Sequence, residues 1–337
     1  MTTEDEVSAE ARQMAGMTLQ DIEHDDWGDP STGETDMIAR CLELRRTPLS
    51  QFDDEDVRLL IGQRISLQLT VPMALGMLQV DPWLGGGTSL GTLLRMVAGL
   101  KPTYWQEHPD QETMLNVIVE KQVAAVSDDP WLVARDYHDY DPPEIDYTLF
   151  MLLGLPTTYW HAHQTIEEQL SVAVDQIIAK LDDDPWYVPP SEPGQEPPGA
   201  LCTMTDLPDA YLDNHLDQAA RITIIVDKAL TVLEHNPWHS GPEWMVPGWG
   251  LSTLMDLPGY PWDKHPDQKI RLYAIVQRVI GVLESNPGFV PPGDSRTKPG
   301  QVLSCIAMPY HDYWESHPEQ AQAIQNINAQ TIAYGTS

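Results

Sequence analysis

A segment that recurs about every fifty residues restricts the fold of this chain more than any other feature. In each copy an aromatic or apolar residue stands three positions before a histidine, and an apolar-striped segment follows. The five pairs are Trp105/His108, Trp160/His163, Leu212/His215, Trp262/His265 and Trp314/His317. Copies of this length are typical of repeat proteins, in which each unit buries its apolar face against its neighbour.

The segment after each histidine has the periodicity of an amphipathic helix. In the third copy, apolar residues take positions i, i+3, i+4, i+7, i+10 and i+11, namely Ile222, Ile225, Val226, Ala229, Val232 and Leu233. The same face recurs from Leu272 to Leu283 and becomes polar after Ile324, as a terminal cap requires. With a short leading helix in each copy, the chain is predicted to be an all-α helical repeat array. It would have two helices per repeat of about 50 residues and follow an N-terminal helical module.

Composition suggests three parts. Residues 1–16 are acidic and lack apolar periodicity, which predicts a disordered leader. Residues 17–127 are expected to form a helical module that includes the first copy. Residues 128–337 would then form four further repeats, the last one a cap. The pattern leaves open whether the copies form an open solenoid or a compact body, and it leaves the oligomeric state open.

The first third of the chain contains blocks that resemble a known family. The blocks are Met17-Thr18-Leu19, Asp25-Asp26-Trp27-Gly28-Asp29-Pro30, Leu44-Arg45-Arg46-Thr47-Pro48-Leu49, Glu55-Asp56-Val57-Arg58-Leu59-Leu60-Ile61-Gly62-Gln63, Val71-Pro72-Met73-Ala74-Leu75 and Tyr104-Trp105. Through them, residues 17 to about 107 resemble the immunity proteins of bacterial contact-dependent growth inhibition (CDI) systems. The resemblance implies a small cytosolic protein that binds and neutralises a delivered toxin domain. This chain continues with about four more copies of the terminal unit.

The charge and the cysteines of the chain indicate which kinds of partner and which cellular compartment are favoured. The formal net charge is -32, with 51 acidic residues against 19 basic ones, which disfavours binding to nucleic acid or an anionic membrane. A basic partner, a saline cytosol or a merely solvated surface would each account for this acidity. Three distant cysteines and the lack of a signal-peptide pattern predict a reduced, cytoplasmic protein. No apolar run is long enough to predict a membrane span.

The repeat histidines are candidates for metal ligands, but each belongs to a different copy. In four of the five copies a proline or leucine and then an acidic residue follow, which places the histidine near a helix start. His161 and His163 form one close pair without a nearby cysteine, so neither a metal nor a cofactor is predicted. The residues assigned to structure are Trp105, His108, Trp160, His163, Trp262, His265, Trp314 and His317.

No group of residues combines a nucleophile, a proton donor and a charge stabiliser, so no catalytic residue and no enzyme activity is predicted. The expected function is non-catalytic binding of a cognate toxin domain, and the acidity favours a nuclease as that toxin. The residues expected to contact it are Asp25, Asp26, Trp27, Asp29, Asp53, Asp54 and Glu55. Trp27 is either an anchor or a core residue, and Asp53 is also predicted to cap a helix. Arg45, Arg46 and Arg58 are expected to form internal ion pairs. The alternative function is a helical-repeat adaptor or scaffold that binds a cellular protein or peptide.

Overall fold

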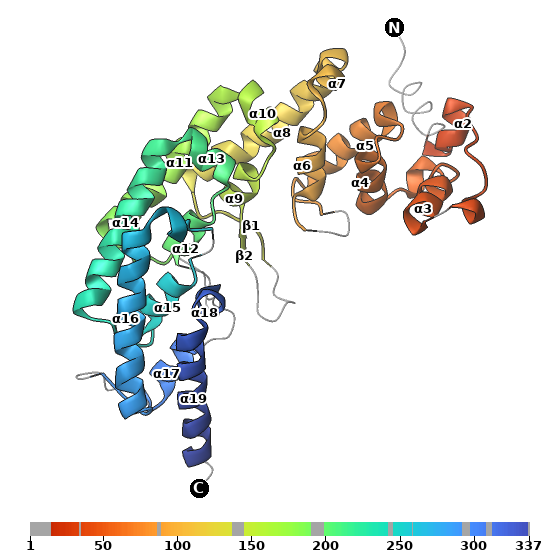
Figure 1. Cartoon of the computed structure of the whole chain (residues 1–337). Helices are drawn as coiled ribbons and strands as arrows, with labels where there is room; N and C mark the ends of the chain where they lie inside the picture. The colour runs from red at the N-terminus through yellow and green to blue at the C-terminus, as the bar shows by residue number, and fades with distance from the viewer. Residues whose placement is uncertain are drawn as a thin grey trace. The chain divides into compact units, whose positions relative to one another are not determined.

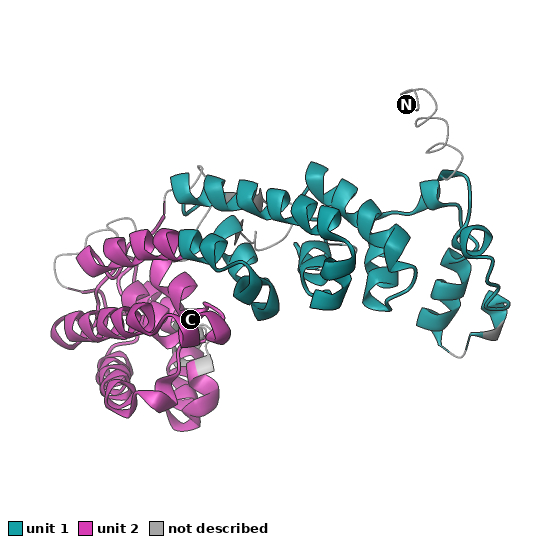
Figure 2. Cartoon of the chain, turned by 90° about the horizontal axis from the view of Figure 1, so that it is seen from above, with its two compact units in different colours: residues 1–170 teal, residues 171–337 magenta. Residues whose placement is uncertain are grey.

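The computed structural model covers the whole chain and describes residues 15–33, 35–85, 89–136, 145–189, 199–241, 245–257, 259–291, 297–307 and 312–335. Most of the expected leader, residues 1–14, lies outside the described residues. The chain divides into two compact units, Met1–Leu170 and Ser171–Ser337, which Figure 2 shows in different colours. The division falls within a helix, whereas the sequence suggested a boundary after residue 127.

The described elements of the first unit are helical apart from one hairpin (Figure 1). Its elements are α2 (Leu19–Glu23), η1 (Pro30–Thr32), α3 (Asp36–Leu44), η2 (Leu49–Gln51), α4 (Asp54–Gly62), α5 (Leu67–Val80), α6 (Thr92–Ala98), α7 (Pro102–Glu107), α8 (Pro109–Asp128), β1 (Val133–Asp136), β2 (Ile145–Tyr147), α9 (Thr148–Leu153), α10 (Thr157–Ala162) and α11 (Gln164–Asp183), of which α11 ends beyond Leu170.

The described elements of the second unit are all helical. They are α12 (Ala200–Thr205), α13 (Asp209–Asn214), α14 (Leu216–His235), α15 (Trp249–Met255), η3 (Trp262–Lys264), α16 (Pro266–Ser285), α17 (Gln301–Ile306), α18 (Asp312–Ser316) and α19 (Pro318–Gly335). In this unit α14 packs on α16, and α16 packs on α19.

The all-α class predicted from the sequence is confirmed, and each copy contains three helical segments instead of two. The extra segment is the aromatic–histidine element, which itself forms a short helix: α7, α10, α13, η3 and α18. A proline stands at or just before the start of α7, α10, α13 and η3, and its fixed φ angle suits the first turn of a helix. The backbone then breaks at the histidine, and the long helix of the copy starts at the next residue.

Local signals in the N-terminal module place its helices. The side chain of Thr35 caps α3 by accepting the backbone N–H of Ile38. The side chain of Asp53 caps α4 by accepting the backbone N–H of Asp56, as the sequence indicated. Arg40 of α3 forms an ion pair with the buried Asp56 of α4 at 2.5 Å. Pro72 lies inside α5, which is one helix of 14 residues.

The stripes on the long helices form the core, as the periodicity predicts. Ile225, Val226 and Ala229 of α14 are 0% exposed. An unforeseen feature is the short antiparallel hairpin β1–β2 between α8 and α9, where Val133 pairs with Tyr147. Its connecting segment, residues 137–144, lies outside the described residues.

Candidate functional site

The turn after α2 is organised around Arg45, whose guanidinium is almost fully buried. Arg45 Nη1 pairs with Glu23 Oε2 at 2.6 Å, and Arg45 Nη2 donates to the backbone oxygen of Asp25 at 2.8 Å. The indole of Trp27 lies over this guanidinium, with Arg45 Cζ 4.1 Å from the ring centroid, a cation–π arrangement. Trp27 is nevertheless 48% exposed, and its Nε1 donates to Asp25 Oδ2 at 2.7 Å. Trp27 is therefore a surface residue with its orientation fixed, and not part of the core.

The remaining acids of this turn are exposed but also hold the backbone. Asp26 accepts the backbone N–H of Gly28 at 3.0 Å and pairs with Arg46 at 3.2 Å, and both interactions keep the pKa of Asp26 below its ordinary value. Gly28 has a φ of +99°, which a residue with a side chain rarely adopts. Hydrogen bonds from the Ser31 hydroxyl and N–H likewise lower the pKa of Asp29. These carboxylates are therefore negatively charged at neutral pH.

A second acidic group lies in the first turn of α4. Asp53 and Glu55 are exposed, while Asp54 and Arg58 are half-buried. Asp25, Asp26 and Trp27 thus lie close to Arg45 and Arg46. The other predicted residues, Asp53, Asp54 and Glu55, lie at the start of α4.

The repeat histidines all stand directly before a long helix, and in three copies the histidine side chain does not cap that helix. His108, His215 and His265 take the N-cap position without a side-chain capping bond. Each ring instead packs on a tyrosine four or five residues earlier. The pairs are Tyr104–His108, Tyr159–His163, Tyr211–His215, Tyr260–His265 and Tyr313–His317, with ring centroids 4.0 to 5.4 Å apart. The tryptophans Trp105, Trp160 and Trp314 are buried, and Trp262 is half-buried.

The same tyrosines take part in a second contact, which the sequence analysis missed and which we call the Tyr–Gln clamp. A tyrosine hydroxyl donates to the side-chain oxygen of the glutamine three residues after the histidine. The pairs are Tyr104–Gln111, Tyr211–Gln218, Tyr260–Gln268 and Tyr313–Gln320, at 2.5 to 2.7 Å. The recurrence of tyrosine before and glutamine after the histidine was the signal that could have revealed it.

In the second unit, the clamp joins each copy to the one before it. Gln218 Nε2 donates to the backbone oxygen of Ser171, Gln268 Nε2 to that of Thr223, and Gln320 Nε2 to that of Tyr273, at 3.0 to 3.3 Å. In the second copy Ile166 replaces the glutamine, and Tyr159 donates directly to Asn116 Oδ1 at 2.9 Å. The repeated tyrosines and glutamines therefore connect neighbouring copies through hydrogen bonds.

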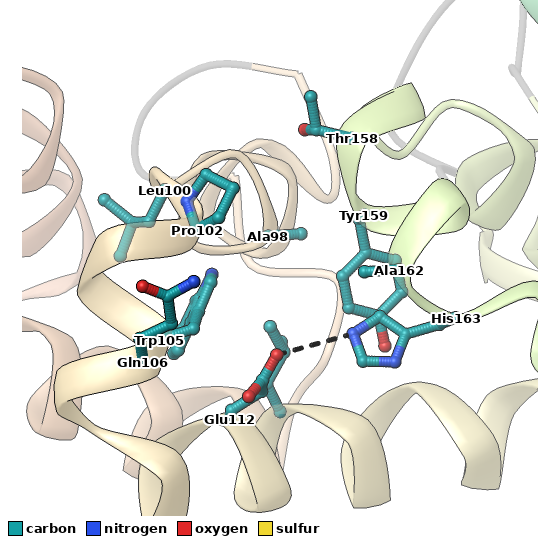
Figure 3. Close-up of a pocket in the computed structure, with 11 residues that line it drawn as sticks. Ala98, Leu100, Pro102, Trp105, Gln106, Glu112, Thr158, Tyr159, Ala162 and His163 are labelled. Atoms are coloured by element: carbon teal, nitrogen blue, oxygen red, sulfur yellow. Dashed lines mark ion pairs between the residues drawn. The ribbon is translucent and has the colours of Figure 1, made fainter.

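A cavity of about 220 Å³ lies between the first and second copies, and we call it the α7–α10 cavity. Trp105 and Gln106 lie on one side of it, Tyr159 and His163 on the other, and Glu112 of α8 lies between them (Figure 3). Glu112 Oε1 is 3.8 Å from His163 Nε2. The further lining residues are Ala98, Leu100, Pro102, Leu115, Thr158 and Ala162.

Metal binding, membrane crossing and thiol chemistry were the other properties considered for the described residues. Among them, no group of three or more His, Cys, Asp or Glu side chains has an arrangement that could hold a metal ion. In the same part of the chain, no helix combines the length and the apolar character needed to cross a membrane. Cys41, Cys202 and Cys305 are free thiols, and burial raises the pKa of each.

The fold and these sites define an all-α protein in which each repeated histidine packs on a tyrosine of its own copy. Comparison with known proteins adds one similarity in its first third: residues 21–115 match the family model of the CDI immunity proteins. This match confirms the resemblance drawn from the sequence blocks. The chain matched no curated protein and no solved structure.

Proposed function

We propose that this chain is an immunity protein that binds a cognate delivered toxin domain in the cytosol and neutralises it without catalysis. The observation that carries the proposal is the match of residues 21–115 to the CDI immunity proteins. The three free thiols suit the reducing cytosol.

We further propose that the toxin contacts the acidic turn around Trp27 and the first turn of α4. Trp27 offers an aromatic surface that the Arg45 guanidinium and Asp25 hold in one orientation, so little rotamer entropy is lost on binding. Exposed Asp25 and Asp26 supply negative charge in the same turn, and exposed Glu55 supplies it in the first turn of α4. A toxin that binds nucleic acid has a basic surface, and the net charge of -32 favours a nuclease for this reason.

Co-expression tests the immunity proposal. The full chain is expressed in cells together with the C-terminal domain of the toxin encoded beside it, and survival is compared with cells that carry the toxin alone. Protection is expected, together with a complex in size-exclusion chromatography. If the cells die although the full chain is expressed in folded form, the immunity proposal is wrong.

Charge reversal tests the binding surface. Glu55→Lys should weaken the complex, whereas Glu284→Lys, an exposed site on α16, should leave it unchanged within about twofold. If affinity barely falls between low and high salt, the electrostatic mechanism and the nuclease assignment lose their support.

One observation favours a second candidate, an adaptor that binds a cellular protein or peptide. Residues 116–337 lie beyond the matched segment, and the long helices α11 and α14 carry the exposed apolar residues Val172 and Ile224, which are 55% and 53% exposed. An adaptor would retain a cellular partner in cells that lack the toxin. An immunity protein would acquire its partner only when the toxin is present, so affinity purification under both conditions separates the two functions.

A further inference from the structure

The α7–α10 cavity has the size of a site for one side chain. Its volume of about 220 Å³ falls below the roughly 300 to 1,000 Å³ of clefts that hold drug-sized ligands. It exceeds the roughly 150 Å³ of an apolar cavity that holds benzene. The residues from Ala98 to Leu115 lie within the segment that matches the immunity family, whereas Thr158 to His163 come from the added second copy. The extension thus completes a cavity on the family-like module.

The cavity carries a negative charge without a fixed positive partner. The Glu112 side chain is 33% exposed. Among the described residues its ionic partner is His163, with 3.8 Å between Glu112 Oε1 and His163 Nε2. Burial holds the pKa of His163 below its ordinary value of 6.5, against the opposite pull of Glu112 and Glu120, so the imidazole is neutral at pH 7. Aromatic rings from Trp105 and Tyr159 line the same space, and their faces attract cations.

An equivalent cavity in the second unit shows how this site differs. It lies between the last two copies, has a volume of about 430 Å³, and uses Trp262, Leu272, Tyr313 and His317 where the first uses Trp105, Leu115, Tyr159 and His163. Lys269 occupies the position of Glu112, and Asp263 that of Gln106. Lys269 Nζ pairs with Asp263 Oδ1 at 2.7 Å, so this second cavity contains a cation of its own.

We infer that the α7–α10 cavity binds a lysine or arginine side chain of the partner protein, with Glu112 as its ion-pair partner and Trp105 and Tyr159 as its aromatic walls. The identity of that partner as the toxin domain rests on the proposed function. The chemistry of the bound side chain rests on the cavity alone.

The site can be probed with a matched pair of small molecules. N-acetyl-arginine amide and the neutral, isosteric N-acetyl-citrulline amide are titrated into the full chain at constant ionic strength. Binding is followed through the indole N–H signal of Trp105 in NMR spectra, assigned from its loss in Trp105→Phe. The arginine probe should give a saturable shift, and the citrulline probe should bind at least about tenfold more weakly.

Variants test whether Glu112 is the anion involved. Glu112→Gln should weaken binding of the arginine probe at least about tenfold, because the ion pair with the guanidinium is replaced by a hydrogen bond to a neutral amide. Glu107→Gln removes one charge at the exposed end of α7 and should change affinity by no more than about twofold. Glu112→Lys, which copies the arrangement of the second cavity, should abolish binding. Circular dichroism melts of all variants confirm that each is folded.

The outcomes separate this inference from the proposed function. Absence of a saturable shift in the wild-type chain, equal binding of both probes, or equal effects of Glu112→Gln and Glu107→Gln would each overturn the cavity inference. Probe binding as expected, in a chain that fails to protect cells from the toxin, would refute the immunity proposal and leave the cavity site standing. Protection without probe binding would refute the cavity site alone.

Discussion

Replacing Gln218 by methionine should remove a Tyr–Gln clamp while nearly conserving side-chain volume. Gln218 is 1% exposed and Tyr211 is 4% exposed, so neither can turn to water. The Gln218 oxygen accepts from the Tyr211 hydroxyl at 2.7 Å, and its Nε2 donates to the backbone and hydroxyl oxygens of Ser171, each at 3.0 Å.

The expected loss follows from the hydrogen bonds that the Gln218 side chain makes. A lost hydrogen bond between buried polar groups costs about 1 to 3 kcal/mol, and the Tyr211 hydroxyl loses the one that it donates to Gln218. The cost is smaller at Ser171, whose carbonyl lies within a helix. We therefore expect Gln218→Met to lower the free energy of unfolding by about 3 kcal/mol. For a unit of the size of Ser171–Ser337, this loss corresponds to a decrease of about 6 to 12 °C in melting temperature.

Urea denaturation followed by circular dichroism measures this loss, and a double-mutant cycle assigns its cause. Tyr211→Phe alone should lower the free energy of unfolding by about 1 kcal/mol. The loss in the double variant should be about 1 kcal/mol smaller than the sum of the two single losses. Gln169→Met, at an exposed site of α11, is the control and should be neutral within about 0.5 kcal/mol. Strict additivity of the two single variants would show that the clamp does not act as a unit.

Three further outcomes are expected. Arg45→Met should lower the free energy of unfolding by about 2 kcal/mol, because it breaks the contacts of a buried guanidinium with Glu23 and with the Asp25 backbone. Arg45→Lys should not restore these contacts. An unchanged urea midpoint in Arg45→Met would contradict the expected loss. Asp53→Ala should cost about 1 kcal/mol through loss of the α4 cap, whereas Asp53→Asn should cost much less, and equal losses would exclude capping as the cause. For His163 the pKa in the folded state lies below its ordinary value of 6.5, so the unfolded chain binds the proton more readily and stability is lost as the pH falls below about 6.5. Between pH 7.5 and 5.5 the wild-type chain should thus lose more stability than His163→Gln, and equal losses would show that His163 does not contribute.

The parts of the fold that the sequence predicted are those governed by local rules. The stripe from Ile222 to Leu233 fixed the buried face of a long helix, and Asp53 marked a helix start, because both signals depend on neighbours within a few residues. The extra short helices and the hairpin β1–β2 were missed. The short helices have three to six residues, too few for an apolar pattern that repeats at helical spacing. Strands of three and four residues likewise show almost no alternation.

The candidate site was predictable only in part. The acidic and aromatic residues around Trp27 could be named, but not the burial of Arg45 beneath the indole, since that contact joins residues far apart in the chain. The histidines are easily recognised in the sequence because their spacing is regular. The tyrosines that contact them vary in offset, with Tyr260 five residues before its histidine and Tyr211 four. Glu112 and His163 meet only through the packing of two copies, which no single-copy pattern contains.

The acceptor in the Tyr–Gln clamp has a consequence for how such a chain can grow. In three junctions of the second unit, glutamine binds a backbone oxygen of the preceding copy. Every residue type offers that oxygen, so a duplicated segment carries its own tyrosine and glutamine and needs no matching side chain in its new neighbour. Gene duplication can therefore lengthen the array in one step, while the side chains of each copy remain free to diverge.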